Sequence, residues 1–423
     1  MSGLVKDNVF GSSGIVAAAA GGLSWDTAVV TGSTVTVEAA NGYFINTTSN
    51  ACTITLPSAA DAGDQIILVD YLRTWGDNAI TIDSNGLNFQ GDPDTYTVDY
   101  DTAGQSINLV YADSTNGWIP TSDITNAFDH DNPPTQKGII VYGNVITGLV
   151  SMSNLVSSSG VIADDVTGVG TARDSPAGAS YGIDKAIVAY GQNGGLQNVS
   201  NLVSNSGVVA SDVSGVGTAR SALAAAEYGT DKAIFAYGYT GSNVSLKNLV
   251  NNSGVVAADV TGVGTARREI KGASYGGIAA GTAIFAYGYS SGYVSMSNLV
   301  NNVGVVASDV SGVGTARYGP GAAEYGTDKA IFAYGTTGSN VSLKNLVNSS
   351  GVVAADVTGV GTARHNVGAT SYGGDKAIFA YGNSGSAVSM SNLVSNVGVV
   401  GSDVTGVGTA RTLPAAAGYS SSA

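Results

Sequence analysis

Short runs in which apolar and polar residues alternate fill residues 24–122, and turn-forming residues separate one run from the next. Because successive side chains of a β-strand point to opposite faces, this alternation predicts half-buried strands. Several short strands without a helix signal predict a β-sandwich or a small barrel. The expected strands are Thr34 to Glu38, Gly42 to Asn46, Cys52 to Leu56, Gln65 to Asp70, Ala79 to Asp83, Tyr96 to Tyr100, Ser106 to Tyr111 and Trp118 to Thr121.

From residue 137 onward the chain is one unit copied in tandem. The tetrapeptide Gly-Thr-Ala-Arg occurs six times, at spacings of 47, 47, 50, 47 and 47 residues, and Tyr-Gly at the end of an apolar run recurs in step with it. The longer spacing reflects an insertion in which Gly277 to Thr282 replaces the usual Asp-Lys turn. A repeat of this period predicts one supersecondary unit per copy. The repeat arginines are Arg173, Arg220, Arg267, Arg317, Arg364 and Arg411, and the Tyr-Gly tyrosines are Tyr142, Tyr190, Tyr237, Tyr287, Tyr334 and Tyr381.

Each copy contains four short segments separated by Gly-containing turns, which favour consecutive antiparallel pairing. In the copy that begins at Ala224 they are segment A (Ala224 to Tyr228), segment B (Ala233 to Tyr237), segment C (Val244 to Val250) and segment D (Val255 to Val260). Four antiparallel strands in a unit of this length are the size of one β-propeller blade.

The two ends of the repeat region are complementary. The first copy, from Lys137, has segments B, C and D but no segment A, whereas the chain after Arg411 supplies a segment A, Leu413 to Tyr419, without the rest. Joining the two completes a sixth blade, so we expect a six-bladed propeller closed by strand exchange. An intertwined β-fibre or solenoid is the alternative architecture.

These patterns divide the chain into four parts, and the expected fold class is all-β. Residues 1–23 fit neither pattern and are interpreted as a docking arm. Residues 24–122 are the β-sandwich domain, residues 123–136 are a polar linker with a Pro pair, and residues 137–423 are the propeller. No cluster of Lys or Arg precedes the apolar residues 14–22, so no export signal is expected.

Composition agrees with an all-β chain that makes many tight turns, since 60 of 423 residues are Gly, 43% are apolar and 11% are charged. The net charge of −14 argues against binding to a nucleic-acid backbone, which needs clustered Lys and Arg. No apolar stretch is long enough to span a bilayer, so membrane insertion is not expected. The lone cysteine, Cys52, lies in a strand pattern and is interpreted as a small buried hydrophobe.

The chain offers little for catalysis. Its two histidines, His130 and His365, are too few for a catalytic triad or a multi-histidine metal site within one chain. Acidic pairs such as Asp164 with Asp165 are interpreted as solvated carboxylates. We therefore expect no catalytic residue, no metal, no cofactor and no enzymatic activity.

Two polar residues recur in every copy, an Asp eight residues before each repeat Arg and an Asn in segment C. A ring of six carboxylates could form a metal or substrate site, but a catalytic site needs different residues that converge once. We favour a structural role in which the Asp accepts turn hydrogen bonds, the Arg bridges to a neighbouring blade and the Asn amide bonds exposed backbone. The aspartates are Asp165, Asp212, Asp259, Asp309, Asp356 and Asp403, and the asparagines are Asn154, Asn201, Asn248, Asn298, Asn345 and Asn392.

Binding is expected on the loops that differ between copies. In an up-and-down blade the B–C loop and the connection from D to the next A emerge on one face, and both vary along this chain. Variable loops on a repeated scaffold are the usual place for recognition, although such loops also drift without function. Tyr rings suit a sugar ring or another protein because they combine a flat apolar face with a polar tip. The candidate ligand-face residues are Tyr239, Tyr289, Tyr293, Tyr318 and His365.

Each copy has an apolar strand that ends in Tyr-Gly, then a polar strand, and later an Arg before a strand of small residues. In these features residues 137–423 resemble the kelch repeat. Tyr-Gly replaces the double Gly of that motif, and no Trp follows segment C. The resemblance implies the blade architecture and no particular partner or activity.

Several motifs follow one another in the first domain, among them Gly42-Tyr-Phe-Ile-Asn-Thr-Thr, Ile54-Thr-Leu-Pro, Val69-Asp-Tyr-Leu-Arg-Thr-Trp-Gly-Asp and Leu109-Val-Tyr-Ala-Asp. On these motifs, residues 24–122 resemble a β-domain of tailed-bacteriophage virion proteins. The resemblance implies a domain that attaches a fibre or decoration to the particle and forms homo-oligomers, often trimers. The Ala-, Gly-, Ser- and Thr-rich propeller is also similar to phage appendages.

The expected function is therefore that of a non-enzymatic virion protein that is assembled in the host cytoplasm. Its N-terminal arm and β-domain would bind other capsid or tail proteins, and its propeller would bind a host-surface glycan or protein. One alternative is a capsid-decoration or head-fibre protein with a stabilising role. An alternative of another class is a carbohydrate-active propeller enzyme, which would need a converging pair of acids.

Overall fold

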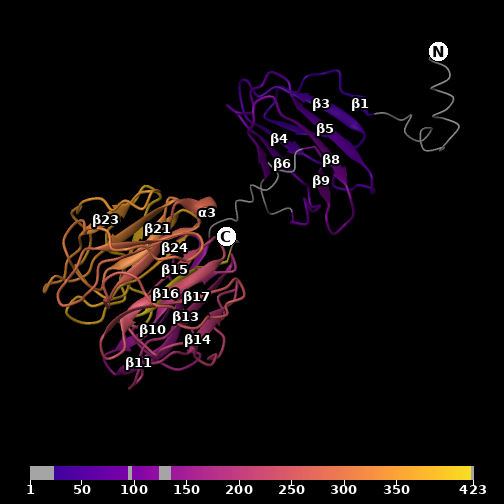
Figure 1. The fold of residues 1–423 in the computed structure, drawn as a ribbon. Coiled ribbons are helices and arrows are strands. Elements are labelled where there is room, and N and C mark those ends of the chain that lie inside the picture. Colours follow the sequence, from indigo (N-terminus) through magenta and orange to yellow (C-terminus); the bar gives the residue numbers. More distant parts are fainter. Residues whose placement is uncertain (1–22, 94–97, 123–134, 421–423) are drawn as a thin grey trace, which may run out of the picture. The chain divides into compact units, whose positions relative to one another are not determined.

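A computed structural model describes residues 23–93, 98–122 and 135–420 of the chain, and the structure is all-β (Figure 1). The chain divides into two compact units, Met1–Asp131 and Asn132–Ala423. The expected docking arm, apart from Leu23, and most of the expected linker, residues 123–134, lie outside the described residues.

The first unit contains two sheets that share one hydrophobic core. One sheet has the strand order β1-β3-β5-β8-β9 and the other β2-β4-β6-β7. All eight expected strands are present, four of them (β2, β4, β6 and β9) one or two residues shorter than expected, and β1 is additional. The strands are β1 (Ser24–Trp25), β2 (Thr34–Thr36), β3 (Asn41–Ile45), β4 (Cys52–Thr55), β5 (Gln65–Asp70), β6 (Ile80–Asp83), β7 (Val98–Tyr100), β8 (Ser106–Tyr111) and β9 (Trp118–Pro120).

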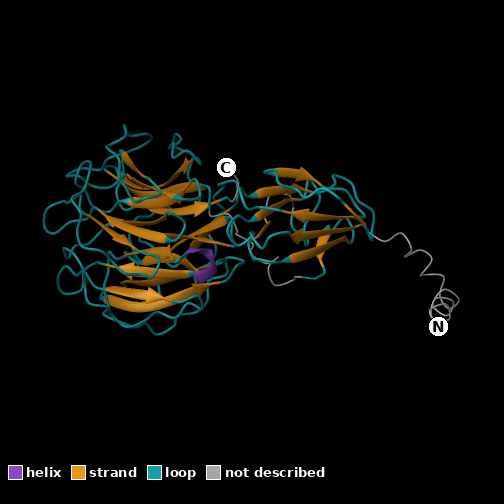
Figure 2. Cartoon of the chain, turned by 90° about the horizontal axis from the view of Figure 1, so that it is seen from above, coloured by secondary structure: helices purple, strands orange, loops and turns teal. Residues whose placement is uncertain are grey.

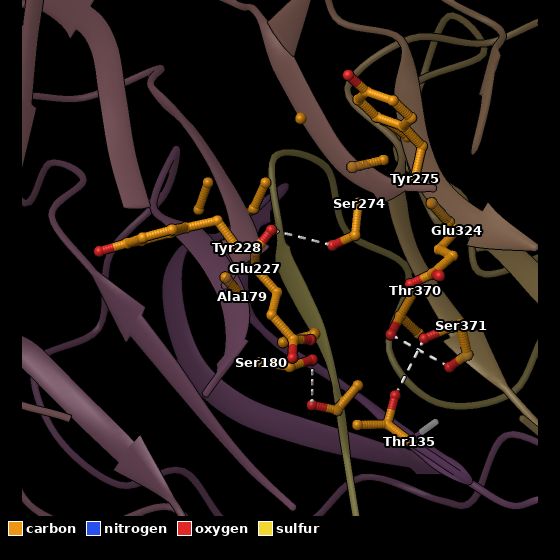
Figure 3. A pocket seen from close by; sticks show the side chains of 18 of the residues that line it. Thr135, Ala179, Ser180, Glu227, Tyr228, Ser274, Tyr275, Glu324, Thr370 and Ser371 are labelled. Carbon is orange, nitrogen blue, oxygen red and sulfur yellow. Dashed lines mark hydrogen bonds between the residues drawn. The ribbon is translucent and has the colours of Figure 1, made fainter. Parts of the chain in front are cut away.

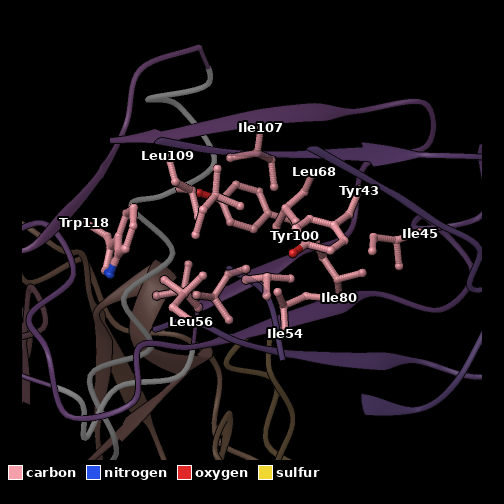
Figure 4. Packing of buried hydrophobic residues seen from close by; sticks show 14 of the residues in the cluster. Tyr43, Ile45, Ile54, Leu56, Leu68, Ile80, Tyr100, Ile107, Leu109 and Trp118 are labelled. Atoms are coloured by element: carbon pink, nitrogen blue, oxygen red, sulfur yellow. The ribbon is translucent and has the colours of Figure 1, made fainter. Parts of the chain in front are cut away.

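The core of this unit follows from the period of two in its sequence. Along β5 buried and half-buried residues alternate, so that Ile66 and Leu68 enter the core. Figure 4 shows Leu68 and Ile107 from one sheet facing Ile54 and Ile80 from the other. The chain crosses between the sheets after each early strand, and for this reason β1, β3 and β5 pair in parallel, as do β2, β4 and β6.

The second unit contains six three-stranded antiparallel sheets, one for each copy of the repeat. In each sheet segment A is the inner strand, B the middle strand and C the outer strand. The inner strands are β12 (Ala177–Tyr181), β15 (Ala224–Tyr228), β18 (Lys271–Tyr275), β21 (Gly321–Tyr325), β24 (Gly368–Tyr372) and β27 (Ala415–Tyr419). The middle strands are β10 (Lys137–Val145), β13 (Lys185–Ala189), β16 (Lys232–Tyr239), β19 (Thr282–Ala286), β22 (Lys329–Ala333) and β25 (Lys376–Ala380). The outer strands are β11 (Gly148–Val156), β14 (Ser200–Val203), β17 (Asn243–Val250), β20 (Ser297–Val300), β23 (Lys344–Val347) and β26 (Ser391–Val394).

The prediction that segment D forms a fourth strand is wrong. In the copy that contains β17, segment D makes only two isolated bridges, Val250 with Val256 and Lys247 with Val260. The register shifts between these bridges because the side chain of Asn248 donates a hydrogen bond to the carbonyl of Ala257 at 3.0 Å. A side-chain amide therefore takes the place of the ladder bond that a regular strand would need.

The expected exchange of strands between the two ends of the repeat region is present. β27 pairs antiparallel with β10, with Lys137 opposite Tyr419 and Val141 opposite Ala415. Gln136, which was expected to belong to the linker, donates its backbone N–H to Ser420 at 2.7 Å and so belongs to this unit.

Neighbouring inner strands contact one another in the cyclic order β12, β15, β18, β21, β24, β27 and again β12. The residue two positions after each repeat Arg has a left-handed backbone and donates its N–H to the carbonyl of the same position in the preceding copy. We call this cycle of six hydrogen bonds the first belt. Its members are Ser175, Ala222, Glu269, Gly319, Asn366 and Leu413, and Ser175 closes the cycle by donating to Leu413.

A second belt joins the opposite ends of the inner strands. Its donors are Gly182, Gly229, Gly276, Gly326, Gly373 and Ser420, which bond in turn to the carbonyls of Asp231, Gly281, Asp328, Asp375, Gln136 and Asp184. The three-residue insertion forms a helical turn, α3 (Gly277–Ala280), drawn in purple in Figure 2. Gly281 follows α3 and supplies the carbonyl that comes from Asp or Gln in the other copies, so the insertion leaves the second belt intact.

Candidate functional site

Each repeat Arg is fully buried and connects two successive copies. The guanidinium of Arg220 lies over the ring of Tyr190 at 4.1 Å and donates a hydrogen bond to Oδ1 of Asn248 at 2.7 Å. Its Nη1 is 3.9 Å from Oδ1 of Asp259, which belongs to the next copy. The Asp eight residues before Arg220, Asp212, instead faces the preceding Arg. Arg411 and Asp165 make the same contact at 3.9 Å between the last copy and the first.

Both carboxylate oxygens of the repeated aspartates already have hydrogen-bond partners within the chain. Oδ2 of Asp259 accepts hydrogen bonds from the backbone N–H and the hydroxyl of Thr218, at 2.9 and 2.6 Å, and Oδ1 accepts one from Asn248 at 2.9 Å. Burial alone would raise the pKa of Asp259, but these hydrogen bonds outweigh it and lower the pKa. The Asp therefore stays ionised next to a buried Arg, which favours the structural interpretation over a ring of metal ligands.

The Tyr of each Tyr-Gly supports the same network. Tyr237 is buried with a left-handed backbone, φ 64°, and its hydroxyl donates to the carbonyl of Val263 at 3.0 Å. Burial raises the pKa of this Tyr to about 12, so the hydroxyl remains a donor. Its ring face carries the guanidinium of Arg267 at 4.5 Å.

The candidate ligand-face residues lie next to one another. The rings of Tyr293 and Tyr318 are stacked with centroids 5.5 Å apart, and Tyr289 meets them edge-on at 5.8 and 6.3 Å. His365 contacts Tyr318 edge-on at 5.9 Å. These loops come from three successive copies, so the packing of neighbouring sheets brings together residues that are 76 positions apart in the sequence.

Arg268 connects the fifth candidate, Tyr239, to this group. Its guanidinium carbon lies 4.9 Å from the ring centroid of Tyr239 and 5.1 Å from that of Tyr289. Arg268 was not among the candidates, although a second Arg directly after the repeat Arg occurs in this copy alone. We call the combined surface the tyrosine patch, and it consists of Tyr239, Arg268, Tyr289, Tyr293, Tyr318 and His365.

Backbone bridges fix the positions of these side chains. In every copy the residue after the repeat Arg bridges to the residue after a Tyr-Gly, which places two variable positions side by side. The tyrosine patch occupies four of the six bridges or their loops, and the remaining two carry Asp, Gln, Asn and Thr side chains. The bridged pairs are Asp174–Gln192, Ser221–Tyr239, Arg268–Tyr289, Tyr318–Thr336, His365–Asn383 and Asn144–Thr412.

The patch is polar at its edges and uncharged apart from Arg268. Nδ1 of His365 is 2.7 Å from Oδ1 of Asn340, and burial lowers the pKa of the imidazole, so the ring is neutral at pH 7. Burial and the nearby Glu269 raise the pKa of Tyr318, against the influence of Arg268. Tyr293 is the most open ring, with 38% of its surface exposed.

A second feature, which sequence analysis missed, is a cavity of about 110 Å³ between the inner strands (Figure 3). The fourth residue of each inner strand lines it. Two of these residues are Glu and the other four are Ser or Gly, and this difference between copies is the signal in the sequence. In chain order the residues are Ser180, Glu227, Ser274, Glu324, Ser371 and Gly418.

The two glutamates titrate abnormally. Burial raises the pKa of Glu227 to about 8, and the charges of Glu324 and Asp231 add to the effect. Burial also raises the pKa of Glu324 to about 8, with a contribution from Asp328. Both carboxyl groups are thus mostly protonated at pH 7, unlike ordinary surface glutamates.

The described residues contain no group of three or more His, Cys, Asp or Glu side chains placed to hold a metal ion. No helix in the same part of the chain is both long and apolar enough to cross a membrane. Cys52 is buried, as expected, and burial raises the pKa of its thiol. No protein-family model and no curated protein matches the chain.

Proposed function

We propose that residues 135–420 form a six-bladed β-propeller with kelch-like blades. Three kinds of contact support closure, namely the pairing of β10 with β27, the two belts, and the contact of Arg411 with Asp165. An open solenoid would leave its first and last copies without these partners. Residues 24–120 would be a β-sandwich, because two sheets share one core.

The second part of the proposal is that the propeller is a non-enzymatic binding module whose ligand is a glycan. The observation that carries it is the tyrosine patch, in which four copies contribute aromatic rings to one surface. Aromatic faces bind the C–H faces of sugar rings, and the neighbouring hydroxyl and imidazole groups can bond sugar hydroxyls. The Arg, Asp, Asn and Tyr that every copy shares hold neighbouring copies together, and the positions that vary between copies are left for recognition.

In the third part, the chain is a bacteriophage virion protein. Its N-terminal arm and β-domain would attach to capsid or tail proteins, and the propeller would project toward the host surface. The resemblance of residues 24–122 to phage virion domains supports this proposal. It also favours a homo-oligomer, and among the possible oligomers it favours a trimer. A capsid-decoration or head-fibre role uses the same anchoring, and an electron micrograph of particles labelled at Ala423 separates these cases by the position of the label. Absence of the label from purified particles would end the virion proposal.

A glycan array tests the binding module. The full chain is compared with a variant in which Tyr239, Tyr289 and Tyr318 are Ala, and with a control in which Gln192 is Ala, since Gln192 occupies an equivalent bridge outside the patch. We expect the triple variant to lose the signal and the control to keep it. Equal signals from all three proteins, or none from the unmodified chain, would refute the proposed module.

A further inference from the structure

The position of Arg268 is fixed by aromatic rings and backbone hydrogen bonds, but no acidic side chain pairs with its guanidinium within the described residues. Its side chain is half-buried between the rings of Tyr239 and Tyr289, and its backbone is fixed by two hydrogen bonds with Tyr289 at 3.0 and 2.8 Å. Within the described residues no hydrogen bond and no ion pair within 4.0 Å engages its guanidinium. Its N–H groups therefore stay available while its position is set by the two aromatic rings.

The preceding residue shows how different this environment is. The guanidinium of Arg267 is fully buried, donates to Asn298 at 2.6 Å and lies 3.8 Å from Asp309. All other arginines of the second unit occupy that repeated setting. Arg268 is thus the one arginine of this unit that lies outside the repeated contacts with Asp and Asn.

The surroundings of Arg268 favour one negative charge. Glu269, an acid that interacts electrostatically with Arg268, is half-buried in the first belt, and burial raises the pKa of its carboxyl group against the opposing charges of Lys271 and Arg268. Glu269 is therefore a weak counter-ion. A single guanidinium on a chain with a net charge of −14 can compensate a monoanion, whereas a dianionic phosphate would leave an excess of negative charge.

We propose that the tyrosine patch binds a sugar that carries a carboxylate, such as a sialic acid or a hexuronic acid. The planar guanidinium of Arg268 would receive the carboxylate in a two-point contact, and the exposed ring of Tyr293 would pack against the pyranose. Its stacked neighbour Tyr318 holds Tyr293 in orientation, at 5.5 Å between centroids. This inference rests on the proposed glycan-binding function and specifies the class of its ligand.

The test uses ligands that differ only in the acid group. The full chain is titrated by calorimetry with sialyllactose, with lactose, and with a trigalacturonic acid and its methyl ester, after an array with sialylated, uronate-bearing, sulfated and neutral glycans. We expect at least one acid to bind ten or more times more tightly than its neutral counterpart, and the affinity to fall as salt is raised from 50 to 500 mM. Preference for sulfated over carboxylated sugars would overturn the carboxylate assignment.

Two substitutions separate charge from geometry. Arg268→Gln should remove the preference for the acid, and Arg268→Lys should weaken it severalfold because an ammonium group lacks the two-point geometry. Lys232→Gln, which removes an exposed cation elsewhere in the unit, should change nothing. If neutral sugars bind equally well and Tyr293→Ala removes binding, the glycan-binding module stands and the acid inference fails. If no glycan binds, both fail.

Discussion

The two glutamates of the cavity lead to a quantitative prediction about stability. Replacing Glu227 and Glu324 with Ser, the residue that three other copies have at this position, removes the only ionisable side chains among these six inner-strand residues. The pKa of each carboxyl group rises from 4.5 to about 8 in the folded protein. At 1.36 kcal/mol per pKa unit this difference amounts to about 5 kcal/mol for each group, an upper limit because a cavity of this size admits water.

The direction of the pH dependence follows from the protonation state that the folded protein favours. Because the folded state favours the protonated carboxyl group, the stabilising effect of protonation is complete below pH 4.5 and is lost as the pH rises to about 8. The stability of the second unit should therefore decrease over this range in the unmodified chain and much less in the double Ser variant. Since the charge of Glu324 raises the pKa of Glu227, Glu324→Ser should also reduce the pH dependence that Glu227 contributes.

Scanning calorimetry or urea denaturation at several values from pH 4.5 to 9 measures this difference. Ser274→Ala is the matched control, because it changes the equivalent position of another copy in the same cavity without removing an ionisable group. Its pH dependence should equal that of the unmodified chain. Parallel curves of stability against pH for the unmodified chain and the double Ser variant would refute the reasoning.

Three further predictions concern the repeat network and the tyrosine patch. Arg317→Ala leaves Asp356 without its buried partner and should lower the free energy of unfolding, measured in urea, by about 3–5 kcal/mol. Lys329 pairs with Asp328 at the surface, so Lys329→Ala should lower it by less than about 1 kcal/mol. Equal costs for the two variants would show that burial is not decisive. A chain that ends at Thr412 lacks β27, and limited proteolysis should cleave its second unit rapidly until a peptide of residues 413–423 is added; resistance without the peptide would contradict closure by β27. NMR titration of His365 should give a pKa below 6.5, since burial lowers it; a value above 6.5 would mean that the patch is more open than described.

The strands of the first unit could be predicted from the sequence because a period of two is a local property. The parallel pairing of β3 with β5 could not, since alternation says which residues are buried and not which strand lies beside which. In the second unit the orphan segment after Arg411 predicted the pairing of β27 with β10, because complementary ends leave one simple solution.

Other features depend on contacts that a repeated sequence hides. Every copy contains both an Asp and an Arg, so their spacing does not tell whether Arg220 meets Asp212 of its own copy or Asp259 of the next. Segment D reads as a strand, but the side chain of Asn248 competes with the ladder. Comparison between copies did indicate the tyrosine patch. It could also have indicated Glu227, which differs from the Ser or Gly of four other copies.

The first belt has a consequence for how this surface can diversify. The residue after each repeat Arg stands between a buried guanidinium and a belt hydrogen bond, as Arg268 stands between Arg267 and Glu269. Its backbone is therefore fixed in every copy, while its side chain differs in all six, being Asp, Ser, Arg, Tyr, His and Thr in turn. Together with their bridged partners these positions form twelve exchangeable places on a rigid frame. Specificity can thus change by single substitutions without any change in loop length, and the same property makes the chain a candidate scaffold for selecting new binders.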